Sequence, residues 1–286
     1  MSQTIHHRLH ILEAADWKAG VITLLEPRSP YRPWRYAFGE ARPGDYAILV
    51  LGTDPASVLT VLARVGDEGG LSGALLNQRY DADLVDLTTV AMLLDLGDDA
   101  FSSWRLDDDA AERVILALHE SPIYGDPFYR WGHSSTAAAR NLLRFNGICH
   151  GCLDEVDLSG AHARDQVFVH TVDPLPRPEP GLPIRAADQA SGRRPYIASL
   201  REATADWPAV ICRRCRDRMR DGGFRSFVAY RFAQHPACPD CGGQRTKSIS
   251  YGMPFEPQSW GPWLYMGGCC PQDAQWHCDV CDHEWV

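Results

Sequence analysis

Short apolar runs alternate with amphipathic segments over the first 130 residues of the chain. Residues 46–51, with the sequence YAILVL, predict a buried strand, and residues 58–65 form a second apolar run that predicts the next strand. Residues 110–119 place Val114 and Leu118 on one face behind an acidic first turn, which predicts an amphipathic helix. This mixture of strand and helix patterns predicts an α+β fold class.

The pattern changes after residue 130. Ser134 and Ser135 are capping residues in front of a helical segment that leads to the first cysteine pair. Residues 173–195 are too rich in proline and glycine for a regular element, and we interpret them as an extended loop. The 286 residues are about twice the usual domain length of about 100 to 150. We therefore expect three parts, which are 1–130, 131–232 with the loop 173–195 as an insertion, and 233–286.

The ten cysteines give the clearest chemical signal. Eight of them form four Cys-x-x-Cys pairs, and two such pairs supply the four thiolates that a tetrahedral zinc ion needs. The alternative is a thioredoxin-like redox pair, but redox chemistry needs only one such motif, at the start of a helix. The spacing therefore predicts two structural zinc ions. The expected ligands are Cys149, Cys152, Cys212 and Cys215 for the first ion, and Cys238, Cys241, Cys278 and Cys281 for a zinc ribbon.

Cys269 and Cys270 remain outside these pairs. One of them can compete with Cys278 for the second zinc ion. Alternatively, both are buried as small apolar side chains. The sequence leaves this choice open.

Charge is distributed unevenly along the chain. The net charge is −9, yet residues 193–231 carry ten arginines against four acidic residues. This bias favours phosphate contact, because a guanidinium group binds two phosphate oxygens at once. A solvated surface with scattered counter-charges is the alternative. Arg213, Arg214 and Arg216 are the candidate phosphate-binding residues.

Cellular location is inferred from two sequence features. No apolar run approaches the roughly 20 residues that a membrane helix needs. The first ten residues also lack the basic start, apolar middle and cleavage site of a secretory signal. We therefore expect a cytoplasmic protein without a membrane span, in which cysteines bind metal rather than form disulfides.

A helical segment, a Cys-x-x-Cys pair, a strand that ends in a histidine and a second Cys-x-x-Cys pair follow one another within residues 131–220. This order resembles the HNH endonuclease superfamily, which has the ββα-metal fold. The resemblance implies a structural zinc ion, a divalent ion such as Mg²⁺ or Mn²⁺ at the nuclease site, and hydrolysis of DNA phosphodiesters. His170, in the sequence Val169-His170-Thr171-Val172-Asp173-Pro174, matches the family's metal-binding position.

Two positions depart from the family's pattern. Thr171 stands where the family has the histidine that acts as general base, and a threonine hydroxyl is no base near pH 7. No asparagine precedes the second Cys-x-x-Cys pair. A shifted register, with His170 as the base and Asp173 or Asp165 as a metal ligand, restores a catalytic set. His170 and Asp173 are therefore the candidate catalytic residues.

The N-terminal segment has a second resemblance. Trp34-Arg35-Tyr36, followed by Gly44-Asp45 directly before the apolar run at 46–51, is similar to the PUA-like superfamily and especially to its EVE branch. Members are small β-barrels with helices that bind nucleic acid, some by taking a modified base into an aromatic pocket. The resemblance implies that Trp17, Trp34 and Tyr36 bind a base, with stacking that contributes about 1–3 kcal/mol per base. Alternatively, these aromatic side chains fill the core of the barrel.

An EVE-like reader joined to an HNH-like domain is the architecture of modification-dependent restriction endonucleases, which act in defence by cutting foreign DNA with altered bases. We therefore expect a DNA-binding hydrolase of this kind. The first alternative is a non-catalytic nucleic-acid reader or adaptor with a degenerate HNH site. The second is a zinc-scaffolded protein without a nucleic-acid role, which the acidic net charge favours. RNA as the ligand and a homodimer as the active form are left open.

Overall fold

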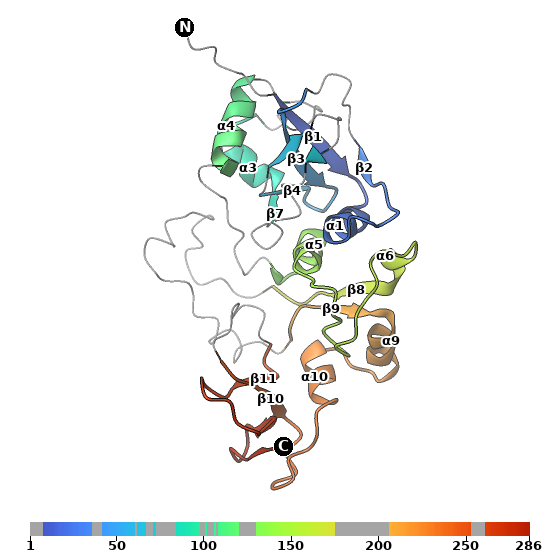
Figure 1. Cartoon of the computed structure of the whole chain (residues 1–286), viewed down its shortest axis with the longest axis vertical. Helices are drawn as coiled ribbons and strands as arrows, with labels where there is room; N and C mark the ends of the chain where they lie inside the picture. Colours follow the sequence, from blue (N-terminus) through green and yellow to red (C-terminus); the bar gives the residue numbers. More distant parts are fainter. Residues whose placement is uncertain are drawn as a thin grey trace.

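The fold of the computed structural model is shown in Figure 1. A sheet with helices on both faces is followed by a unit made of β8 (Val167–His170), β9 (Ala209–Cys212) and α9 (Arg213–Asp221), and then by a small four-stranded sheet. The fold therefore mixes helices and strands in several sheets, as the expected α+β class requires at this coarse level. Tyr36 lies outside the described residues, as does the segment 173–195 apart from Asp173 and Pro174. The structure describes residues 8–35, 42–60, 62–66, 71–72, 84–97, 101, 106, 108–119, 130–174, 206–252 and 261–286.

The N-terminal sheet has the strand order β2-β1-β3-β4-β7, with β5 paired to β3 and β6 paired to β5. β1 and β3 are parallel, with α1 between them in the chain, and the other strand pairs of this sheet are antiparallel. The elements are β1 (Leu9–Ala14), α1 (Trp17–Leu25), β2 (Trp34–Arg35), β3 (Tyr46–Leu51), β4 (Ser57–Leu59), β5 (Ala63–Val65), β6 (Leu71–Ser72), β7 (Leu84–Asp86), α3 (Leu87–Leu93) and α4 (Asp108–His119).

Alternate residues of the central strand β3 enter two different hydrophobic clusters. Leu49 and Leu51 pack in the cluster that includes α1 and the buried helix α5 (Ser135–Leu143). Ile48 and Val50 pack with α3 and α4 on the other face. This follows from the two-residue repeat of a strand, and it explains why the run at 46–51 is apolar throughout.

The apolar run at 58–65 forms two strands instead of the expected single one. β4 pairs with the C-terminal end of β3, where Val58 is opposite Val50, and β5 pairs with its N-terminal end, where Arg64 is opposite Tyr46. The chain bends at Thr60 between them. Hydrophobicity does not reveal this break, because residues on both sides of it are buried.

The expected PUA-like barrel is not confirmed. Among the described residues, β2 and β7 end the main path of the sheet and do not pair with each other. The Gly44-Asp45 pair has a local structural role, because the buried carboxylate of Asp45 accepts hydrogen bonds from Arg42 N and His10 Nε2, both at 2.9 Å. It thereby ties the start of β3 to β1.

Helix α5 connects the N-terminal sheet to the part of the chain that carries the cysteine pairs. Ser134 caps it by accepting a hydrogen bond from Ala137 N, as the sequence predicts. The helix contacts α1, β7, β8 and β9, and Arg140 donates from Nε to the carbonyl oxygen of Leu84 at 2.8 Å. One hydrophobic cluster therefore continues from the first sheet into the part that carries the cysteine pairs.

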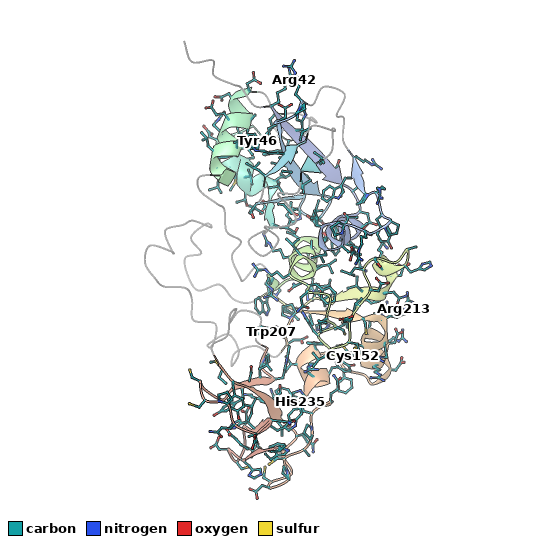
Figure 2. The ribbon with its side chains drawn as sticks, viewed as in Figure 1. Arg42, Tyr46, Cys152, Trp207, Arg213 and His235 are labelled. Atoms are coloured by element: carbon teal, nitrogen blue, oxygen red, sulfur yellow. The ribbon has the colours of Figure 1, made fainter. Side chains whose placement is uncertain are left out.

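The C-terminal elements form a second, smaller assembly. The short helix α6 (Ala163–Gln166) leads into β8 (Val167–His170), and β9 (Ala209–Cys212), α9 (Arg213–Asp221) and α10 (Phe227–Phe232) follow. The ring centre of Trp207, which is labelled in Figure 2, lies 6.4 Å from that of Trp263, the residue directly before β11. The final sheet has the order β11-β10-β12-β13. Its strands are β10 (Thr246–Ser250), β11 (Leu264–Met266), β12 (Trp276–Cys278) and β13 (Glu284–Trp285).

Candidate functional site

The first two cysteine pairs meet at the end of β9. Cys212 is the last residue of β9 and Cys215 lies in the first turn of α9, while Cys149 and Cys152 lie in the loop after α5. The four Sγ atoms all lie within 4.8 Å of one another, and those of Cys152 and Cys212 are 3.8 Å apart. Zinc–sulfur bonds of about 2.3 Å in a tetrahedron place sulfur atoms about 3.8 Å apart. The donor set and the spacing therefore fit a zinc ion.

The last two cysteine pairs form a second group of the same kind. The Sγ atoms of Cys238 and Cys281 are 3.7 Å apart, and those of Cys241 and Cys278 are 3.6 Å apart. These separations far exceed the S–S bond of about 2.05 Å in a disulfide. Both predicted groups of four cysteines are thus assembled in the structure, and each can hold one metal ion.

Three of the four Cys-x-x-Cys loops share one backbone turn. The N–H of Leu153 donates to the carbonyl oxygen of Cys149, and the same bond joins Gly242 to Cys238 and Asp282 to Cys278, each at 2.9 Å. Leu153, Gly242 and Asp282 all have positive φ angles, of 62°, 72° and 55°. In these three loops the turn accompanies the approach of both sulfur atoms of a pair to their group, and of the three residues with positive φ only Gly242 lacks a Cβ atom.

Backbone dipoles and burial act on the thiols in opposite directions. Hydrogen bonds from the backbone N–H groups of Val280 and Cys281 lower the pKa of Cys278 to about 7. Burial raises the pKa of Cys149 and of Cys215. Metal binding requires thiolates. The thiolate forms of the buried Cys149 and Cys215 therefore depend on the positive charge of a bound ion.

Cys269 and Cys270 are not part of either group. Both side chains are exposed, so the interpretation of these residues as buried apolar groups is wrong. They follow β11 at the surface, outside both metal-binding groups and outside the hydrophobic core.

His170 forms a pair with Asp206, at the point where β8 ends. Its Nε2 lies 2.8 Å from Oδ2 of Asp206, and the two side chains are 18% and 24% exposed. The other carboxylate oxygen, Oδ1, accepts hydrogen bonds from Trp207 N, Ser226 Oγ and Phe227 N. Burial raises the pKa of Asp206, but the hydrogen bond and charge of His170 and these backbone N–H groups outweigh burial and lower the pKa overall.

Asp173 lies in a different pair. Its Oδ1 is 3.0 Å from Nε2 of His133, whose Nδ1 is 3.1 Å from Oγ1 of Thr171. A β-bridge between Gly132 and Val172 holds these segments together. The side chains of His133 and Asp173 are 59% and 97% exposed. The structure therefore does not pair His170 with Asp173, and the catalytic role of Asp173 stays a prediction.

The three candidate phosphate-binding arginines lie on α9, with unequal availability. Arg214 forms an ion pair with Asp154 and lies beside the Cys152 thiol. Arg216 lies over the Phe168 ring, with Cζ 3.9 Å from the ring centre, and Arg213 lies farther from the same ring. Figure 2 shows Arg213 on the unit formed by β8, β9 and α9. Arg213 and Arg216 are the better placed of the three for a ligand.

The two described candidate base-binding residues lie against the core. Trp17 and Trp34 are partly buried and pack on the cluster that contains α1 and α5. Trp34 Nε1 donates to Thr23 Oγ1 at 2.9 Å. These contacts give both rings a structural role, and their role in binding a base stays a prediction.

Three functional candidates were missed from the sequence. Asp206 is separated from His170 by the insertion, although it lies three residues before β9, the strand that pairs with β8. Lys18 and Arg164 lie with Phe168 and α9, and no local pattern links them. The pairing of β8 with β9 reveals that Asp206 lies beside His170. The packing of α1 reveals that Lys18 lies beside Phe168.

The chain matches none of the protein families, curated proteins or solved structures with which it was compared. No helix among the described ranges has the length and apolar character to cross a bilayer. Function therefore has to be argued from the site itself.

Proposed function

We propose that this chain is a zinc-scaffolded nucleic-acid hydrolase that cleaves phosphodiester bonds at the end of β8. The observation that carries the proposal is the His170–Asp206 pair on a zinc-held strand pair that leads directly into an arginine-rich helix. A histidine oriented by a carboxylate next to phosphate-binding cations is the arrangement that hydrolysis of a phosphodiester needs.

The protonation of His170 follows from its partner. The lowered pKa of Asp206 keeps this carboxylate ionised and acceptor-only near neutral pH. Nε2 of His170 therefore carries the proton, and Nδ1 has a lone pair that can accept a proton from water. Proton transfer to Nδ1 would generate the nucleophile for attack on phosphorus.

The nuclease-site Mg²⁺ or Mn²⁺ ion has no support from the described residues. Among them, only the two cysteine groups bring three or more metal-binding side chains together. Both oxygens of Asp206 are already hydrogen-bonded, so this carboxylate is poorly suited to an additional cation. The described residues therefore provide no ligand set for such an ion beside His170.

The specificity for modified bases rests on the EVE-like resemblance of residues 1–130. It places the chain near the modification-dependent restriction endonucleases, with the N-terminal part as reader. The partly buried positions of Trp17 and Trp34 give both rings contacts with the core as well.

A non-catalytic nucleic-acid reader is the second candidate. It is favoured by Thr171, which occupies the position of the expected base, and by the hydrogen bond that Phe227 N at the start of α10 donates to Asp206, which gives this carboxylate a structural reason to be present. In this case His170 only holds the strand end to α10.

Cleavage assays distinguish the two candidates. The zinc-loaded protein and its His170→Gln variant are incubated with unmodified and cytosine-modified plasmid DNA, with and without Mg²⁺ or Mn²⁺. Cutting by the parent protein that is lost in the variant supports the hydrolase, and a preference for modified DNA supports the reader. Binding by both proteins without cutting by either assigns the chain to the second candidate.

A further inference from the structure

Positively charged side chains from two separate helices converge on the Phe168 ring of β8. Lys18 Nζ, from α1 of the N-terminal region, lies 4.9 Å from the ring centre. Arg216 Cζ and Arg213 Cζ, from α9, lie 3.9 Å and 6.0 Å from the same centre. The faces of an aromatic ring attract cations, so Phe168 gathers charges that would otherwise repel one another.

Two of these cations lack a carboxylate partner among the described residues. Arg216 forms an ion pair with Asp217, at 3.1 Å. Lys18 has no ion pair in this part of the chain, and Arg213 donates only to the backbone oxygen of Asp165, at 2.6 Å. The neighbouring Arg164 is occupied by Asp16, at 2.7 Å. The cluster therefore presents positive charge that its own acidic residues do not neutralise.

Lys18 is half-buried beside these charges. Burial is the main cause that lowers its pKa to about 8, followed by the charge of Arg164, whereas Asp165 and Asp16 raise the pKa and Arg216 lowers it least. A half-buried ammonium group beside other cations is stabilised when an anion enters the cluster.

We infer that Lys18, Arg213 and Arg216 around Phe168 form a binding site for a backbone phosphate of nucleic acid, shared between α1 and α9. The site rests on the nucleic-acid ligand of the proposed function, but it does not require cleavage. The phosphate-binding residues predicted from the sequence all lie on α9. The inferred site adds Lys18 from the N-terminal helix α1 to them.

The position of this site fits the proposed chemistry. Phe168 and His170 are alternate residues of β8 and therefore point to the same face of the strand, about 7 Å apart along it. When a phosphate of the nucleic acid is held over Phe168, the next stretch of the nucleic-acid backbone lies beside His170. The phosphate site would thus position the strand that His170 acts on.

Binding measurements without divalent ions test the site independently of cleavage. The Kd of the zinc-loaded full chain for a labelled 20-base-pair duplex is measured over a range of NaCl concentrations, for the parent protein and for Lys18→Ala and Arg216→Ala. Arg28→Ala is the matched control, because it also removes one positive charge but its side chain is 83% exposed and paired with Glu26. Zinc content and thermal unfolding verify that each variant is folded.

Each site variant is expected to bind more weakly and to reduce the slope of log Kd against log salt by about 0.9, the value for one lost phosphate contact on duplex DNA. Arg28→Ala is expected to keep the slope of the parent protein. Equal slopes for Lys18→Ala and Arg28→Ala, or no binding by the parent protein, would overturn the site.

The outcomes also separate this inference from the hydrolase. Binding that depends on Lys18 in a protein that never cuts DNA supports the site and rejects the hydrolase. Cutting that depends on His170, together with a salt slope that does not depend on Lys18 or Arg216, rejects the site and supports the hydrolase.

Discussion

The carboxylate of Asp206 lies 2.8 Å from Nε2 of His170 and at the same time accepts a hydrogen bond from Phe227 N at the start of α10. One residue thus orients the histidine at the end of β8 and fixes the start of α10. The pair is only partly exposed, which restricts competition by water for the bond. A substitution of Asp206 is therefore expected to change the stability of the fold as well as the activity.

Asp206→Asn is expected to lower the free energy of unfolding by about 1–3 kcal/mol, because it replaces a charge-assisted acceptor of several buried donors by a neutral amide. Activity is expected to fall as well, since an amide can present its NH₂ group to His170 and invert the tautomer. Denaturant unfolding and DNA cleavage measured on the same preparation check both effects. A variant with unchanged stability would contradict this structural role.

The zinc content is expected to be two ions per chain. Cys152→Ser and Cys278→Ser are each expected to retain only one ion and to unfold at lower temperature, because each removes a ligand from a different group. Cys269→Ser with Cys270→Ser is the matched control and is expected to keep both ions, because these cysteines are exposed and outside the groups. Metal analysis and thermal unfolding provide the measurement. Loss of an ion from the control would show that the ligands have been wrongly assigned.

Gly151 is expected to tolerate no side chain. A Cβ atom there would lie 2.7 Å from the Sγ atom of Cys215, so Gly151→Ala would displace a zinc ligand. We expect a loss of about 1–3 kcal/mol in stability, as for other overpacked sites, and weaker retention of the first zinc ion in chelator competition. Gly160→Ala is the matched control, since its Cβ would meet only Asp157 Oδ2 at an ordinary 3.5 Å. Equal behaviour of the two variants would disprove the steric argument.

Affinity for nucleic acid is expected to fall as the pH rises from 7 to 9. The pKa of Lys18 is lowered to about 8, so its ammonium group loses its proton within this range. The groups that face it are Asp16, Arg164, Asp165 and Arg216, and aspartate and arginine side chains do not ordinarily titrate there. Lys18→Arg keeps its charge and is expected to bind with little dependence on pH. The comparison of Kd at the two pH values is the test, and an equal decrease in both proteins would assign the effect to another group.

The sequence predicts those features that depend on neighbouring residues. Ligand spacing identifies both cysteine groups, and the Ser134 cap and the apolar run at 46–51 identify α5 and β3. These predictions hold because caps, strand periodicity and Cys-x-x-Cys loops are local.

Features that depend on tertiary packing are not predicted. The break between β4 and β5 follows from their pairing with different ends of β3. The contact of Lys18 with Phe168 requires α1 to pack beside β8, although the two residues are far apart in the chain. Sequence patterns give no register between such segments.

We propose that His170, oriented by Asp206, is the general base of a phosphodiester hydrolase. The most direct test compares single-turnover DNA cleavage by the parent protein, His170→Gln and His133→Gln. His133 is a suitable comparison, because it also pairs with an aspartate near the end of β8 but is largely exposed.

Removal of a general base is expected to slow cleavage by about 100-fold or more in His170→Gln, whereas His133→Gln is expected to cleave at the parent rate. Cleavage that survives in His170→Gln, or DNA binding without any cleavage by the parent protein, would contradict the claim.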